Sequence, residues 1–374
     1  MSLTLPQHDP VASWDEDILH LVASGLARLA ERVQADGMVR IPYPAPLQRA
    51  VNRMTVSCRV RGLRPPSGVA ELLELAHQPL SNWPLRLSPE LAGDGDVLLT
   101  SGTPTRLCQE WALDVDDVEA ELSERRVVLD VLHWCRDMQD QQAYVAFRRL
   151  MVEEPVLTGD ELLDVRSRDR LAPLAAFVLQ AYERPGLHLA AGGFFQACGR
   201  CCTLSVPTPH GWRCVEDDCA RLTYRPGRQF PAGSEIWTVS RGLRTFVTGP
   251  GRAELRLLGW LIDKKYNPEA YPQFDLCDIR IPVPQQPGRW WAVDVKSWRN
   301  PALLARRLRR RLPPVPAWAD KVFVVIDRER TRGRPGYVQL VTNLVPELAA
   351  NGIVVRTEKT FLREDLLALR GEPQ

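Results

Sequence analysis

The ten residues RWWAVDVKSW, positions 289–298, place two charged side chains inside an otherwise apolar stretch. Successive side chains of a strand point to opposite faces, so Val293 and Val295 share one apolar face. Asp294 and Lys296 then share the other face. A charge pair within a buried strand costs free energy unless it has partners or a chemical role. The pair therefore marks this predicted strand as a candidate functional site.

A second strand is predicted just upstream in LCDIRIPV, residues 276–283, followed by the turn sequence PQQPG. Within it, Asp278 and Arg280 share one face. Antiparallel pairing of the two strands brings Asp278 near Asp294 and Lys296. Carboxylate oxygens are the hard ligands that Mg²⁺ and Mn²⁺ prefer. Two carboxylates and a lysine on one polar face therefore predict a divalent metal site.

Such a metal would polarise a scissile phosphate and lower the pKa of an attacking water. Lys296 would orient that water and stabilise charge in the transition state. Glu254 lies in a predicted amphipathic helix, GRAELRLLGWLIDKK at 251–265, from which it would reach the metal or its waters. The backbone carbonyl of Val295 is a further candidate ligand.

Five of the nine cysteines fall within residues 198–219. Two short turns, one with two and one with four intervening residues, present four thiolates and suit a closed, tetrahedral, structural Zn²⁺ site. The candidate ligands are Cys198, Cys201, Cys214 and Cys219. Cys202 and His210 are spare ligands, and the two-residue spacing favours Cys201 over Cys202. Buried free cysteines without metal are the alternative.

A basic segment follows the charged strand. Residues 301–334 carry ten basic and three acidic side chains, and PALLARRLRRRL at 301–312 predicts a helix opened by proline. Phosphate contacts from such a helix supply affinity without reading sequence. A solvated arginine-rich face is the alternative. The candidate nucleic-acid-binding residues are Arg280, Arg306, Arg307, Arg309, Arg310 and Arg311.

These motifs together resemble the PD-(D/E)xK nucleases. The resemblance rests on Asp278, on Asp294-Val295-Lys296, on Glu254 in the preceding helix, and on an αβββαβ-like order of elements over about residues 235–360. It implies a restriction-endonuclease-like fold and Mg²⁺- or Mn²⁺-dependent cleavage of phosphodiester bonds. Cys277 stands where the family name has proline, and the second acid is Asp rather than Glu.

A narrower resemblance covers about residues 140–360. YVAFRRLMVEEPVLTGDELL at 144–163, the cysteine cluster, GLRTFVTGPGRAELRL at 242–257 and WWAVDVKSWRNPALLARRL at 290–308 look like the endonuclease-like protein of prokaryotic Piwi (pPIWI-RE) three-gene islands. The resemblance implies an antiphage or anti-plasmid setting. It also implies a Piwi-type protein and a DinG-like helicase as neighbours.

The whole chain predicts an α+β multidomain protein. Its 374 residues are 45% hydrophobic and 25% charged, with net charge +2, which is ordinary for a globular protein. We expect a mostly helical region at 1–190 for protein docking or a helix-turn-helix, a zinc ribbon at 194–224, and a nuclease-like α/β domain at 232–370, beginning with a hairpin at 235–249. The sequence shows neither a signal peptide nor an apolar run that predicts a membrane span, so a cytoplasmic location is expected.

The sequence leaves three alternatives open. Asp275 competes with Asp278 as the first metal ligand. Asp294 paired with Lys296 or Arg280 in a purely structural salt bridge would need no metal. A non-catalytic nucleic-acid-binding adaptor, using the ribbon and the arginine helix, is the rival to a nuclease that acts on DNA more than RNA. Double-strand cleavage would need a homodimer.

Overall fold

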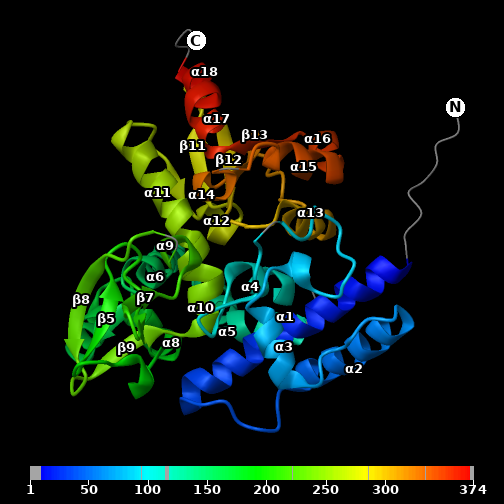
Figure 1. Ribbon diagram of the computed structural model, residues 1–374. Helices are drawn as coiled ribbons and strands as arrows, with labels where there is room; N and C mark the ends of the chain where they lie inside the picture. The colour runs from blue at the N-terminus through cyan, green and yellow to red at the C-terminus, as the bar shows by residue number, and fades with distance from the viewer. Residues whose placement is uncertain are drawn as a thin grey trace, which may run out of the picture. The chain divides into compact units, whose positions relative to one another are not determined.

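The structure is a computed structural model (Figure 1). It describes residues 10–93, 95–113, 118–220, 222–284, 286–332 and 334–370. The start of the predicted helix at 114–135 and position 285 of the predicted hairpin turn lie outside these residues. The chain divides into two compact units, Met1–Val118 and Glu119–Gln374.

The first unit is mainly helical. Its helices are α1 (Pro10–Asp36), α2 (Ala45–Val60), α3 (Val69–Ala76) and α4 (Arg106–Leu113), with a turn η1 (Leu80–Asn82) and a short hairpin of β1 (Leu99–Thr100) and β2 (Thr103–Pro104). Ile18, Leu19 and Val22 of α1 are fully buried, as the 3.6-residue spacing of its apolar side chains predicts. Asp15 is also fully buried, and Arg61 pairs with it at 2.9 Å.

The second unit begins with helices that pack around one apolar core. They are α5 (Val118–Asp137), α6 (Gln141–Glu153), α7 (Gly159–Ser167) and α8 (Ala175–Ala181), with the turn η2 (Ala172–Leu174). Asp140 caps α6 by accepting from the amide of Ala143 at 2.9 Å. Thr158 and Glu161 form a reciprocal capping box at the start of α7. Tyr144 and Phe147 of α6 are completely buried in this core.

The predicted hairpin at 235–249 is wrong. β9 (Ile236–Val239) lies instead between β3 (Val156–Thr158) and β4 (Tyr182–Glu183) in a three-stranded antiparallel sheet. The residues that follow are helical, in α10 (Arg241–Leu243), the π-helix η4 (Arg244–Thr248) and α11 (Gly249–Asp263). The cause is tertiary: Leu243 and Val247 pack into the helical core, and the partners of β9 are distant in sequence.

The cysteine region consists of two small ribbons. β5 (Phe194–Cys198) pairs with β8 (Pro226–Pro231), and β6 (Ser205–Thr208) pairs with β7 (Gly211–Cys214), all antiparallel. The turn η3 (Leu187–Leu189) precedes β5, and α9 (Asp217–Ala220) follows β7.

The C-terminal part contains a five-stranded mixed sheet in the order β10-β11-β12-β13-β14. Its strands are β10 (Glu269–Ala270), β11 (Ile279–Pro282), β12 (Trp290–Lys296), β13 (Ala319–Ile326) and β14 (Ile353–Thr357). The accompanying helices are α12 (Pro272–Asp275), α13 (Pro301–Arg310), α14 (Arg328–Thr331), α15 (Tyr337–Leu344), α16 (Glu347–Ala350), α17 (Glu358–Thr360), η5 (Phe361–Asp365) and α18 (Leu366–Arg370). β10, β11 and β12 are antiparallel, whereas β12, β13 and β14 are parallel.

The alternation predicted for β12 is confirmed. Val293 and Val295 are buried against Leu257 of α11 on one face of the sheet. On the opposite face, Ala292 packs against Leu304 of α13. Helices therefore cover both faces (Figure 1). The strand's charged residues, at its carboxyl end, are only half-buried.

Among the described residues, no helix has the length and apolar character needed to cross a membrane.

Candidate functional site

Asp278 and Asp294 face each other at the end of the β11–β12 ladder. The last residue pair of that ladder is Ile279 with Val293, so the next position outward aligns the two aspartates. The amide N–H of Val295 donates to Oδ2 of Asp278 at 2.6 Å. The carboxylate of Asp278 is thereby fixed to the neighbouring strand. Two carboxylates thus lie side by side at one edge, as the sequence predicts.

Lys296 lies beside this pair, with its Nζ 2.7 Å from Oδ1 of Asp294. The side chains of Lys296 and Asp294 are 27% and 16% exposed, so an ion or a phosphate can approach them from solvent. Burial by itself would lower the pKa of Lys296, but the charges of Asp294 and Asp278 outweigh it and raise that pKa. The lysine therefore stays protonated near neutral pH.

The surroundings of Asp278 disfavour its charged form, whereas those of Lys296 favour the charged form. Burial, followed by the negative charges of Glu254 and Asp294, raises the pKa of Asp278 well above its usual value. A carboxylate that lies beside two others in a partly buried site is stabilised by a bound proton or cation. The cluster therefore has the charge character of a cation site.

Glu254 projects from α11 and is buried. Its Oε2 accepts hydrogen bonds from the Tyr271 hydroxyl at 2.9 Å and from Nη2 of Arg148 at 3.2 Å. Burial raises the pKa of Glu254, and the charge of Arg148 opposes that effect. Electrostatic interaction with Lys296 places Glu254 within the same charged cluster.

Asp275, the alternative ligand, is directed toward α6. Its Oδ2 accepts from the hydroxyl of Tyr144 at 2.7 Å and lies 3.7 Å from Nη1 of Arg148. Asp278, in contrast, is the residue in register with Asp294.

The carboxylates do not form a complete metal cage on their own. Within the described parts of the chain, one group of three or more Cys, His, Asp or Glu side chains has all its donor atoms within 4.8 Å, and it is the cysteine cluster. Mg²⁺, however, usually binds one or two protein carboxylates and keeps several waters. Two adjacent, half-buried aspartates fit that requirement.

Sequence reasoning missed Gln141, Tyr144 and Arg148 of α6. Arg148 is 106 residues from Glu254, and Gln141 is 130 residues from Tyr271, to whose carbonyl it donates. No periodicity or spacing signals contacts over such separations.

Asp327 was also missed, although it had a signal. It directly follows the apolar strand β13, which runs parallel to β12, and carboxyl ends of parallel strands meet at one edge. Its amide donates to the carbonyl of Lys296 at 3.0 Å. Its side chain accepts from Ser297 at 2.9 Å and from Arg256 at 2.7 Å. Arg256 also pairs with Glu358 at 2.8 Å.

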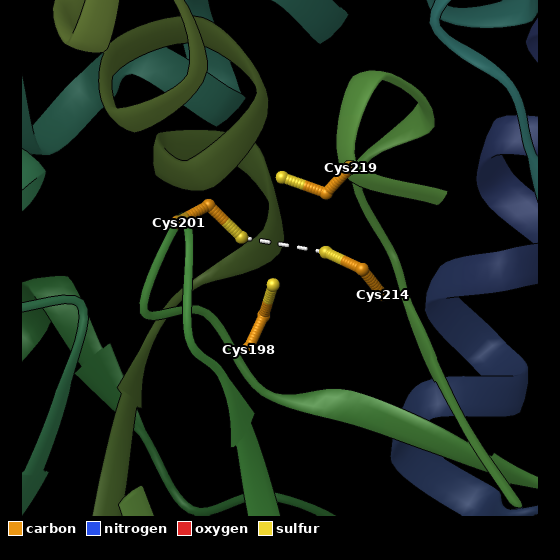
Figure 2. A group of neighbouring side chains, drawn as sticks. All are labelled: Cys198, Cys201, Cys214 and Cys219. Atoms are coloured by element: carbon orange, nitrogen blue, oxygen red, sulfur yellow. Dashed lines mark hydrogen bonds between the residues drawn. The ribbon is translucent and has the colours of Figure 1, made fainter. Parts of the chain in front are cut away.

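Four cysteine side chains converge between the two ribbons (Figure 2). Their sulfurs lie within 4.8 Å of one another, and Sγ of Cys201 is 3.3 Å from Sγ of Cys214. A tetrahedral Zn²⁺ with bonds near 2.3 Å separates its sulfurs by about 3.8 Å, so the donors fit zinc. The group is Cys198, Cys201, Cys214 and Cys219. Hydrogen bonding from the other three thiols lowers the pKa of Cys198, which favours its thiolate.

The two spare ligands are placed elsewhere. Cys202 is exposed and has a positive φ of 60°, and His210 is exposed in the β6–β7 turn. The spacing argument for Cys201 thus selects the residue that the structure brings into the group.

The cysteine cluster is tied to α11. The amide of Glu216 donates to Sγ of Cys214 at 3.4 Å. The Glu216 carboxylate pairs with Arg252 at 2.8 Å and with Arg244 at 3.7 Å. Arg252 lies two positions before Glu254 on the same helix. The cluster therefore braces the helix that carries a candidate catalytic acid.

The predicted nucleic-acid-binding arginines divide into two groups. Arg280 pairs with Glu269 at 2.6 Å, and its guanidinium lies 4.2 Å from the ring centre of Trp290. The other group is on and after α13, whose Leu304 and Leu308 are buried. There, Arg306 and Arg307 are half-buried, whereas Arg309, Arg310 and Arg311 are exposed. Arg309 donates to the carbonyl of Leu344, and Arg311 follows the last helical residue.

Two family models match separate segments of the chain. Residues 251–372 match the family model described as "REase associating with pPIWI_RE", so this part is a restriction-endonuclease-like domain. Residues 18–158 match "pPIWI_RE three-gene island domain Y". The chain therefore belongs to the endonuclease-like proteins of pPIWI-RE three-gene islands. No curated protein and no solved structure matches it. This membership links the chain to the Piwi-type protein of the same island.

Proposed function

We propose that this protein is a Mg²⁺- or Mn²⁺-dependent endonuclease that hydrolyses phosphodiester bonds of nucleic acid, DNA rather than RNA. The observation that carries the proposal is the alignment of Asp278 with Asp294 on neighbouring strands, with Lys296 beside them. This arrangement lies inside the segment that matches the restriction-endonuclease-like family.

Each side chain has a role that follows from its surroundings. Asp278 and Asp294, with the backbone carbonyl of Val295, would hold the metal. The metal would supply a Lewis acid for the phosphate and lower the pKa of a bound water. Lys296, kept protonated by its carboxylate neighbours, would orient the attacking water and stabilise developing negative charge. Glu254 would accept hydrogen bonds from metal-bound waters.

The order of elements supports a PD-(D/E)xK assignment. α11, β10, β11, β12, α13 and β13 occur in this order as helix, three strands, helix and strand, with the short helix α12 between β10 and β11. We assign to the motif the acid before β11, Asp278, the D-x-K residues in β12 and the acid in α11, Glu254. The proposed metal site is at the carboxyl end of β12, where Asp294 and Lys296 are half-buried.

Zinc is proposed for the cysteine cluster. Four cysteines with no His and no open position suit a structural site rather than a catalytic one. Its function would be to hold the two ribbons together and to brace α11 through Glu216 and Arg252.

The exposed arginines at the end of α13 provide a surface for the substrate backbone. Arg310 and Arg311 lie after β12 in the chain and belong to the same sheet-and-helix domain. Their charges would attract phosphates without reading bases. Arg280 would add a contact beside Trp290.

The family supplies the proposed biological setting. In an island with a Piwi-type protein and a DinG-like helicase, a cytoplasmic nuclease would act against phage or plasmid DNA. The mostly helical region at 1–190 is proposed to dock a protein partner or to contain a helix-turn-helix. Cleavage of both strands by a single-site subunit would require a homodimer.

A non-catalytic adaptor remains the second candidate, and one observation favours it. The ion pair between Asp294 and Lys296 forms without a metal, and Oε2 of Glu254 already accepts hydrogen bonds from Tyr271 and Arg148. A purely structural network would look the same. An adaptor would bind nucleic acid through the ribbon and the arginines of α13.

A cleavage assay separates the two candidates. Single- and double-stranded DNA and RNA are incubated with the full chain in Mg²⁺, Mn²⁺ or EDTA. We expect metal-dependent cleavage that is lost in both Asp294→Ala and Lys296→Ala but retained in Asp320→Ala. Asp320 is a suitable control because it is an exposed acid of the same sheet, and its carboxylate pairs with the exposed side chain of Arg289 at 3.2 Å. Cleavage that survives both active-site substitutions, or salt-sensitive binding with no cleavage, would overturn the nuclease assignment.

A further inference from the structure

Helix α6 lies against the proposed metal site, although it is far from that site in sequence. Its residues belong to the segment that matches domain Y, whereas α11 and β12 belong to the nuclease-like segment. Three α6 side chains contact the site region: Gln141, Tyr144 and Arg148. Their spacing of three and then four residues puts them on one face of the helix. That face is directed at α12 and α11.

The segment immediately before Asp278 has an unfavourable backbone conformation. Tyr271, Gln273, Phe274 and Asp275 all have positive φ, between 47° and 68°. Residues other than glycine are disfavoured in this left-handed region, most of all in succession. Such strain persists only where surrounding contacts compensate for it, and it is concentrated at functional sites.

Gln141 supplies the compensating contacts. Its Nε2 donates to the carbonyl of Tyr271 at 2.6 Å, and its Oε1 accepts from the amide of Phe274 at 2.6 Å. The amide of Tyr271 in turn donates to the carbonyl of Asp278 at 2.8 Å. The hydroxyl of Tyr144 donates to the carboxylate of Asp275, the last residue of the segment. One side-chain amide thus connects α6 to the backbone of a proposed metal ligand.

Arg148 contacts the second acid, Glu254. Arg148 is 5% exposed, and its guanidinium pairs with Glu254 and Asp275 and lies 4.7 Å from the ring centre of Tyr271. Tyr271 donates to the same Glu254 oxygen. The carboxylate of Glu254 is thereby held in one orientation by two donors.

We propose that α6 is a working part of the nuclease centre, in which Gln141 and Arg148 are positioning residues that fix Asp278 and Glu254 for metal binding. This inference rests on the proposed function and deepens it. The catalytic unit then extends across both family segments. A fragment that begins at α11 would carry every proposed ligand of Mg²⁺ or Mn²⁺ and still lack the helix that positions two of the acids.

The test measures Mn²⁺ binding to the full chain by titration calorimetry without nucleic acid, together with kcat and KM for cleavage. The variants are Gln141→Ala and Arg148→Lys. Arg149→Gln is the matched control, because Arg149 is on the same helix but pairs with exposed Glu153. We expect each test variant to bind Mn²⁺ about tenfold more weakly, the lower end for loss of an outer-shell partner. We also expect kcat to fall while KM for nucleic acid stays within about twofold.

The outcomes separate this inference from the proposed function. If wild type binds Mn²⁺ and Asp294→Ala abolishes that binding, the metal site is supported independently of α6. Test variants that then melt as wild type does and bind Mn²⁺ as wild type does would overturn the role of α6. If wild type binds no Mn²⁺, the proposed function fails and this inference with it. If Gln141→Ala does not fold, Gln141→Glu keeps the acceptor for Phe274 and loses the donor to Tyr271. It must then show the weaker Mn²⁺ binding.

Discussion

Asp278 is bonded to the backbone of the strand that carries the D-x-K motif: its Oδ2 accepts from the amide of Val295 at 2.6 Å. This hydrogen bond joins the residue just before β11 to Val295 of β12, which lies between Asp294 and Lys296. It holds a carboxylate beside two others, although burial and their charges raise its pKa. An arrangement that is electrostatically unfavourable in the absence of a cation indicates function rather than stability.

Asp278→Asn should therefore separate activity from stability. Asn keeps the shape of the side chain and an oxygen acceptor for the Val295 amide, but it removes the negative charge. We expect cleavage to fall about 100-fold, as for a lost metal partner, while the midpoint of thermal unfolding does not fall. Kinetics and calorimetry on the same preparation check both. A variant that is markedly less stable yet fully active would contradict this interpretation.

Asp327 should make stability depend on pH. Burial would raise the pKa of Asp327, but Arg256, the Glu329 amide and Arg330 outweigh it and lower that pKa. A carboxylate with a lowered folded-state pKa stabilises the protein above its unfolded pKa of about 4 and loses that contribution as pH falls below it. We expect Asp327→Asn to cost about 3 kcal/mol at pH 7, the low end for breaking a buried pair.

The check for Asp327 is urea unfolding of wild type and Asp327→Asn between pH 3 and 7. The difference in free energy of unfolding should be constant above about pH 5 and shrink below about pH 4. Exposed Asp320→Asn serves as the control and should differ little from wild type at any pH. A difference that stays the same down to pH 3 would exclude an ionic origin.

Zinc should be bound with a stoichiometry of one ion per chain. Replacing Cys198 and Cys214 together by Ser removes two of four ligands, so we expect loss of zinc and a lower unfolding temperature. Elemental analysis and calorimetry measure these effects. Cys202→Ser is the matched control, because Cys202 is adjacent in sequence but exposed and outside the group. Native protein without zinc, or a double variant as stable as wild type, would count against the site.

The arginines at the end of α13 should contribute affinity rather than chemistry. The double variant Arg310→Gln and Arg311→Gln lacks two positive charges. The slope of log affinity against log salt concentration should therefore decrease in magnitude by about two for double-stranded DNA. The cleavage rate at saturating DNA should not change. Binding titrations at several salt concentrations measure the slope. The control is Arg168→Gln, which disrupts ion pairs with Asp164 in α7 and with Glu154 at the end of α6. This variant should leave the slope unchanged.

Local patterns predicted much of this protein. Side-chain alternation gave the two faces of β12, and cysteine spacing selected the residues that cluster. Helical periodicity gave the buried positions of α1. These features depend on residues close together in the chain. The interaction of Asp278 with Val295 follows from the same hairpin.

Long-range pairing was not predictable in the same way. Ile236–Val239 looked like half of a hairpin, because its apolar residues show a strand but not its partners, which are β3 and β4. Likewise, nothing in the sequence around Gln141 or Arg148 shows that they contact Tyr271 and Glu254. Tertiary packing determines both outcomes.

The most direct test of metal binding by Asp278 and Asp294 is the anomalous scattering of a crystal of the full chain soaked in Mn²⁺. We expect an anomalous peak from an ion coordinated by Asp278 and Asp294, with the amine of Lys296 moved away from Asp294. An absent peak at saturating Mn²⁺, with the ion pair of Asp294 and Lys296 unchanged, would contradict it.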